Sequence, residues 1–156
     1  MERREFLAGS SGAATLALVA ASGLTPPAFA QNAPGWNPAA FAAKTLADVA
    51  QALGAATAPV ESAELTLQAP DIAENGSVVR VSARSLLADT SLIALLVEKN
   101  PSALAALFEI PPGTEAQVAT NLKMAESSRV YALAKVGEQY LYAVREVKVT
   151  LGGCGA

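Results

Sequence analysis

The chain has 156 residues, of which 52% are hydrophobic and 16% are charged, with a formal net charge of −3. It contains no histidine and one cysteine, which excludes a Ser-His-Asp triad, a Cys-His pair, a His-ligated metal, an internal disulfide, a CxxC redox pair and a thiolate zinc site. This length and apolar content indicate one folded domain, and the mild acidity argues against a nucleic-acid-binding surface.

Residues 1–30 have the three parts of an export signal. Arg3 and Arg4 form the positive n-region, an uncharged stretch follows, and an Ala-Phe-Ala sequence is typical of a cleavage site. The Arg-Arg-Glu-Phe-Leu sequence is similar to the twin-arginine export motif, whose substrates cross the membrane folded; an ordinary secretory signal is the alternative. Glycines and serines in the apolar stretch argue against a membrane span. We therefore expect a mature chain that begins at Gln31 in the periplasm.

The mature domain, residues 31–151, is predicted to begin with one helix. Asn37 followed by Pro38 is typical of an N-cap and a proline at the first helical position. The composition of residues 39–53 favours helix, and Gly54 is typical of a helix C-terminus. Four apolar residues fall on one helical face: Ala42, Leu46, Val49 and Leu53.

After Pro59 the pattern changes to short strands separated by turns. Apolar and polar residues alternate around Leu65 and Leu67 and over residues 78–84, as in half-buried strands. The continuous apolar run at residues 91–97 predicts a central strand that is buried on both faces. Further strands are predicted at residues 104–110, 115–124, 129–135 and 139–151, with a turn at 136–138. About six or seven such strands predict an antiparallel immunoglobulin-like β-sandwich.

The chain ends in residues 152–156, Gly-Gly-Cys-Gly-Ala, which we call the arm. The arm carries the protein's one thiol, Cys154. Glycine loses much conformational entropy on ordering, so Gly152, Gly153 and Gly155 predict a flexible arm that can carry the sulfur into a partner's pocket. The position of the cysteine fits neither a lipobox nor a prenylation site. An incidental cysteine, or one buried by folding back, is the alternative interpretation.

Five segments in order make the chain similar to a known family. They are the twin-arginine signal and residues 69–76, 97–101, 123–128 and 147–155. On these segments the chain resembles the SoxY family, the sulfur-carrier subunits of the periplasmic thiosulfate-oxidising (Sox) system, over essentially its whole length. It departs from the family pattern at two places: Ala156 replaces a terminal glycine, and Ser102-Ala103 replaces Asn-Pro.

The resemblance implies a covalent sulfur carrier with no catalytic residue, no metal and no cofactor of its own. Cys154 would hold thiosulfate-derived sulfur through an S–S bond. The resemblance also implies a complex with a SoxZ-like β-sandwich subunit, which would explain the folded export of a cofactor-free protein. It implies transient docking with a SoxXA-type cytochrome, a SoxB-type dimanganese hydrolase and, where present, a SoxCD-type sulfane dehydrogenase. An exposed thiol also favours disulfide-linked dimers through Cys154.

Other functions remain open at this point. A specialised paralogue would serve other sulfur enzymes, as Ala156 allows. Alternatively, the chain would be a periplasmic β-sandwich binding protein whose tail cysteine has no function. A thiol enzyme would need a shaped pocket and a low-pKa thiolate, which a glycine tail does not supply. Deletion of residues 152–156 would separate a carrier from a binding protein.

Outside the arm we interpret the residues structurally. Residues 74–76 predict a tight turn, and Glu98 and Lys99 a solvated strand end. Three tyrosines on the last two strands predict packing in the core or against the partner subunit: Tyr131, Tyr140 and Tyr142. Three charged residues either border the docking surface of the arm or form a solvated face: Lys123, Glu126 and Arg129.

Overall fold

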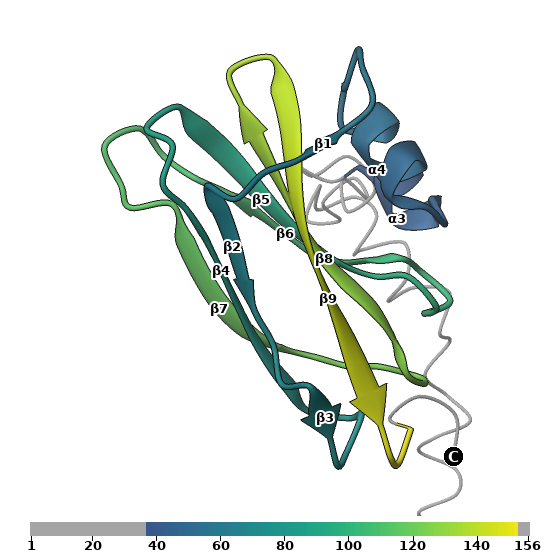
Figure 1. Ribbon diagram of the computed structural model, residues 1–156. Coiled ribbons are helices and arrows are strands. Elements are labelled where there is room, and N and C mark those ends of the chain that lie inside the picture. The colour runs from purple at the N-terminus through teal and green to yellow at the C-terminus, as the bar shows by residue number, and fades with distance from the viewer. Residues whose placement is uncertain (1–36, 153–156) are drawn as a thin grey trace, which may run out of the picture. The chain divides into compact units, whose positions relative to one another are not determined.

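The computed structural model describes residues 37–152, which form two short helices followed by a β-sandwich (Figure 1). The helices are α3 (Pro38–Ala42) and α4 (Leu46–Ala52). The larger sheet contains β1 (Val60–Glu61), β3 (Ile72–Ala73), β5 (Thr90–Val97), β6 (Leu104–Glu109), β8 (Ser128–Val136) and β9 (Gln139–Val149). The smaller sheet contains β2 (Leu65–Gln68), β4 (Val79–Ser85) and β7 (Gln117–Leu122).

The strand order is β1-β9-β8-β5-β6 in the larger sheet, with β3 also paired to β9, and β2-β4-β7 in the smaller one. All pairings are antiparallel except those of β1 and β3 with β9, which are parallel. Seven strands in the described part of the chain have four or more residues: β2, β4, β5, β6, β7, β8 and β9. This architecture confirms the predicted, mainly antiparallel β-sandwich.

The helical region differs from its prediction, because it contains two helices rather than one. The first is capped as expected, with Asn37 Oδ1 accepting a hydrogen bond from the Ala40 amide at 3.0 Å. The backbone then turns extended at Ala43, with φ −65° and ψ 147°. Thr45 caps the second helix by accepting from the Asp48 amide at 3.1 Å. A threonine N-cap thus interrupts a run whose composition favours one helix.

The interruption changes which residues face the sheet. The predicted single face included Ala42, which is exposed, whereas Ala40 is fully buried. In the second helix Val49 and Ala50 are fully buried. Because the break resets the helical phase, 3.6-residue spacing cannot be counted across it.

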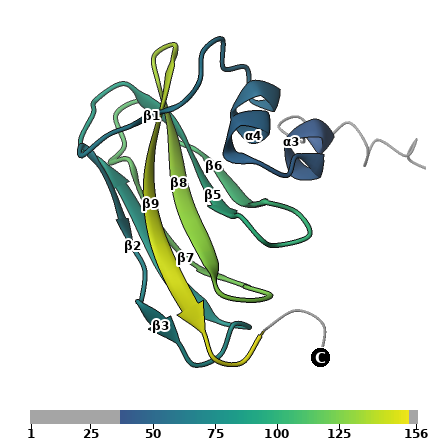
Figure 2. The same ribbon diagram turned by 45° about the vertical axis from the view of Figure 1, so that its right-hand side comes forward.

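Strand β5 is buried on both faces, as its continuous apolar run predicts. Ile93, Leu95 and Val97 contribute to the core between the two sheets. Ala94 and Leu96 face the other way, into a second core beneath the helices. Figure 2 shows α3 and α4 on this outer face of the larger sheet, close to the start of β9. No helix within residues 37–152 has the length and apolarity to cross a membrane.

Two side-chain hydroxyls fasten the helices to the sheet. Tyr140 Oη on β9 donates to the Leu53 carbonyl oxygen at 2.6 Å. Ser102 Oγ, in the β5–β6 loop, donates to the Phe41 carbonyl oxygen at 2.6 Å. Ser102, one of the two departures from the family pattern, therefore ties the loop to α3.

We expect Tyr140→Phe to lower the free energy of unfolding by about 0.5–1.5 kcal/mol, because the buried hydroxyl bond to Leu53 is lost. Burial, with Glu138 adding, raises the pKa of the Tyr140 hydroxyl above its ordinary 10.0. Its contribution is therefore complete below pH 10 and is lost as the pH rises through the folded-state pKa. Urea unfolding at neutral and alkaline pH should show a smaller alkaline loss in the variant. Tyr142→Phe is the control, because its ring contact with Tyr131 survives the change.

Candidate functional site at the base of the arm

The structure describes one residue of the predicted arm, Gly152. The other predicted site residues lie outside the described part of the chain: Gly153, Cys154, Gly155, Arg3 and Arg4. What the structure gives is the position from which the arm leaves the sandwich. We call residues 148–152 the arm base.

One side of the arm base is held by the loop at residues 71–76, which contains β3. Lys148 donates its amide hydrogen to the Asp71 carbonyl at 2.9 Å, and Thr150 donates its amide hydrogen to the Ala73 carbonyl at 3.1 Å. The Thr150 hydroxyl donates to the Glu74 carbonyl at 2.8 Å. Figure 2 shows β3 beside the end of β9.

The other side of the arm base is held by the loop at residues 123–128. The regular β8–β9 ladder ends at the pair Ser128–Val147. Beyond it, Ser127 Oγ accepts from the Val149 amide at 2.9 Å and lies 3.4 Å from the Val149 carbonyl oxygen. A side-chain hydroxyl therefore replaces the missing strand partner.

Gly152 lies directly against this second loop. A Cβ atom added at Gly152 would overlap the backbone carbonyl oxygen of Ala125. Gly152 has no positive φ, so the space beside Ala125 is what requires a glycine here. The lack of space is therefore a second reason for glycine at position 152, in addition to the flexibility that the sequence predicts for the arm glycines.

The two loops are also bonded to each other through Gly76. Its amide donates to the Leu151 carbonyl at 2.7 Å, and its carbonyl accepts from the Met124 amide at 2.7 Å. One buried residue, Gly76, thus links the arm base to the second loop. The predicted turn at residues 74–76 is present, with Asn75 Oδ1 accepting from the Ser77 amide at 2.8 Å. Its role as a bridge was not apparent from the sequence.

Asn100, in the β5–β6 loop, braces the second loop. Its side-chain amide donates to the Lys123 carbonyl at 2.7 Å, and its Oδ1 accepts from the Ala125 amide at 3.0 Å. Between them, the side chain of Met124 is fully buried in the core between the sheets. We call residues 71–76 and 123–128 together with Asn100 the exit clasp.

The exit clasp collects three segments that are far apart in the sequence. They are the family-like segments at residues 69–76, 97–101 and 123–128, each of which alone resembles an ordinary turn or strand end. In the fold they meet around the fourth such segment, the end of β9. The order of these segments in the sequence indicated the family, but nothing in the sequence indicated that the segments contact one another in the fold.

A charged cluster lies beside the exit clasp, at the end of β5. Glu98 accepts two hydrogen bonds from the Arg129 guanidinium, at 2.6 and 2.9 Å. The Tyr131 hydroxyl lies 3.4 Å from Glu98 Oε1, and the guanidinium carbon lies 5.8 Å from the Tyr131 ring centroid. Glu98 thus lies at a partly exposed strand end, as the sequence predicts, and is also paired with Arg129 there. Lys99 is exposed and lies 3.7 Å from Glu126.

The cluster also affects protonation. Burial, with Glu98 adding, raises the pKa of the Tyr131 hydroxyl, and the hydrogen bonding that Arg129 donates to Glu98 raises the pKa of Arg129. Both groups therefore keep their protons at neutral pH. Tyr131 is buried and Tyr142 half-buried, and their rings meet edge-on with centroids 6.0 Å apart. Packing in the core is thus confirmed for these tyrosines.

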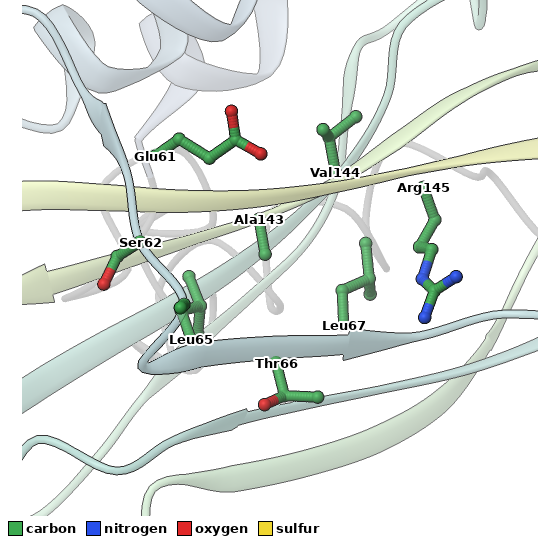
Figure 3. A pocket seen from close by; sticks show the side chains of 9 residues that line it. Glu61, Ser62, Leu65, Thr66, Leu67, Ala143, Val144 and Arg145 are labelled. Carbon is green, nitrogen blue, oxygen red and sulfur yellow. The ribbon is translucent and has the colours of Figure 1, made fainter.

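A separate cleft of about 470 Å³ lies between β2 and β9 (Figure 3). Leu65, Leu67 and Ala143 form its apolar part, and Arg145 stands at one side. Its lining residues come from β1, β2, the segment between them and the middle of β9, and none belongs to the exit clasp. Within residues 37–152 no group of three His, Cys, Asp or Glu side chains could hold a metal ion.

Comparison with known proteins identifies the family. The model of the family "Sulfur oxidation protein SoxY" matches residues 49–154. The match covers the β-sandwich, the arm base and the one cysteine that follows it. The chain belongs to the SoxY family. No curated protein sequence matches it.

Two solved structures illustrate the range of similarity. The sulfur carrier protein SoxY from Chlorobium limicola f thiosulfatophilum is 31% identical, with a TM-score of 0.59 over 67% of this chain and 96% of that one. A lytic polysaccharide monooxygenase from Jonesia denitrificans is 16% identical, with a TM-score of 0.40 over 52% of this chain and 58% of the other. The first likeness supports the family and the fold, and the second is too slight to support either.

Proposed function

We propose that this protein is a covalent sulfur carrier of periplasmic thiosulfate oxidation and that Cys154 is the attachment point. The observation that carries the proposal is the extent of the family match, which runs as far as residue 154, the one cysteine of the chain. The related SoxY structure is described as that of a sulfur carrier protein. The exit clasp supports the proposal because it fixes the point from which the arm starts.

The proposed loading step joins the Cys154 thiolate to the outer sulfur of thiosulfate. An S–S bond forms, two electrons leave, and the product is a cysteine S-thiosulfonate. A c-type cytochrome of the SoxXA type is the oxidant that accepts these electrons. The thiolate, rather than the thiol, is the nucleophile in such chemistry.

The proposed unloading step is a hydrolysis in which the carrier is the substrate. Water attacks the terminal sulfonate sulfur, the S–S bond to that sulfur breaks, and sulfate and two protons leave. The sulfane sulfur remains on Cys154 as a persulfide. A SoxB-type dimanganese hydrolase would supply this activity, and a SoxCD-type dehydrogenase, where present, would oxidise the remaining sulfur.

The proposal includes a SoxZ-like partner subunit and export through the twin-arginine route. The family supports the first of these and the Arg3-Arg4 signal supports the second. Export as a folded complex would let a partner without its own signal leave the cytoplasm. Dimers linked by a disulfide between two Cys154 residues would be an unloaded, oxidised form of the carrier.

Intact-mass spectrometry tests the proposal directly. The protein is purified with its partners from the periplasm of thiosulfate-oxidising cells, before and after mild reduction. We expect an added mass on the peptide containing Cys154 that increases with thiosulfate and disappears with reductant. A thiol that never gains sulfur beside active partner enzymes would contradict the proposal. An adduct formed from another sulfur donor but never from thiosulfate would instead indicate a specialised paralogue.

A further inference from the structure

We propose that Ser127 and Asn100 are positioning residues that hold the arm base, so that the free part of the arm begins after Gly152. Four backbone groups of residues 149–151 are held by the exit clasp: the Val149 amide, the Val149 carbonyl, the Thr150 amide and the Leu151 carbonyl. Gly152 then abuts Ala125. The arm is therefore held further along the chain than the end of the strand ladder at Val147.

Ser127 acts on the arm base directly. Residues up to Val147 are held by the many hydrogen bonds of the β8–β9 ladder, which no single side chain controls. Past that point the Val149 amide is bonded to the hydroxyl of Ser127 at 2.9 Å. Without this oxygen the Val149 amide would hydrogen-bond to water, and the arm base would lose this hydrogen bond to the loop at residues 123–128.

Asn100 acts through the loop that it braces. Its two hydrogen bonds fix the backbone on both sides of Met124. The Met124 amide is bonded to the Gly76 carbonyl, and the Gly76 amide is bonded to the Leu151 carbonyl. Asn100 therefore stabilises the position of Leu151 indirectly, through the successive hydrogen bonds of Met124 and Gly76.

The length of the free arm follows from covalent geometry. With the exit clasp closed, only Gly153 lies between Gly152 and Cys154, so the Cα atoms of Gly152 and Cys154 lie no more than about 7 Å apart. If the chain were released back to Val147, seven residues would be free and could span about 23–25 Å. A clasped arm samples fewer positions than a released one, so less entropy is lost when a partner enzyme receives the sulfur.

A nitroxide spin label on Cys154 tests the positioning role without any sulfur chemistry, because the chain has no other cysteine. We expect Ser127→Ala and Asn100→Ala to give a more mobile label at room temperature than the unsubstituted chain. Ser127→Thr keeps the hydroxyl and should restore the original spectrum. The matched control is Ser102→Ala, which removes a hydroxyl bond to Phe41 on the helix side of the molecule. Identical spectra for all variants would overturn the proposal.

Hydrogen exchange gives a second readout that needs no label. The Val149 and Thr150 amides should be protected in the unsubstituted protein. In Ser127→Ala the Val149 amide should exchange about tenfold faster, while amides in the middle of β5 stay unchanged. An unprotected Val149 amide in the unsubstituted protein would overturn the proposal even if a variant failed to fold.

The functional part of this inference rests on the proposed carrier role. In a steady-state assay with the partner oxidase, Ser127→Ala and Asn100→Ala should raise the KM for the carrier several-fold with little change in kcat. A carrier that gains no sulfur in its unsubstituted form would contradict the proposed function alone, because the label and exchange results stand separately. Active variants with altered label mobility and an unchanged KM would overturn the positioning role.

Discussion

Cys154→Ser is expected to abolish every thiosulfate-dependent gain of mass and all thiosulfate oxidation that depends on this protein. Serine has nearly the shape of cysteine, but its hydroxyl cannot form the S–S bond that holds the sulfur. The sulfur is proposed to stay covalently bound between enzymes, so no second group can take over part of the role. The measurement is the intact mass of the carrier, together with the oxidation of thiosulfate by the reconstituted partner enzymes.

Deletion of residues 153–156 is the companion to that substitution. It removes the thiol but keeps every described residue of the exit clasp, through Gly152. Unfolding by urea and binding to the partner subunit should therefore match the full chain, while sulfur loading is lost. If either variant still gained sulfur from thiosulfate, a site other than Cys154 would have to carry it, and the proposed function would be wrong.

Met124→Ala is expected to lower the free energy of unfolding by about 2–5 kcal/mol and to loosen the arm base as well. Met124 is fully buried between the sheets, so truncation removes apolar contacts and leaves a cavity. The same residue anchors the loop that contacts Gly152 and bonds to Gly76. Urea unfolding measures the first effect, and the mobility of a spin label on Cys154 measures the second.

Leu133→Ala separates these two effects. Leu133 is also fully buried, but it belongs to the core beneath the helices. Its truncation should cost a similar amount of stability and leave the label on Cys154 unchanged at concentrations where the protein is folded. Equal loosening in both variants would mean that the arm base responds to global stability rather than to its own anchor.

The sequence predicted the features that depend on neighbouring residues. The Asn37-Pro38 start of the first helix, the two-sided burial of β5 and the turn before β9 all follow from local spacing and side-chain type. In that turn Gly137 has a φ of +57°, which glycine adopts without strain. The β-sandwich followed from the number and spacing of such strands.

What could not be predicted depends on residues far apart in the chain. Strands β1 and β3 have two residues each, too few to show any alternation, and they form because β9 offers them an edge. The exit clasp joins Gly76, Asn100 and Ser127 to the arm base. No periodicity encodes a contact of this kind, because each partner is an ordinary loop residue in its own segment.

The place of β9 in the larger sheet has a consequence for how the chain folds. It pairs with β8 on one edge and with both β1 and β3 on the other, although it is the last of the described strands along the chain. The early strands β1 and β3 therefore have no partner until residues 139–149 have left the ribosome. Pairings of such large sequence separation form slowly. We expect this domain to fold only after β9 has been synthesised, in a single cooperative step.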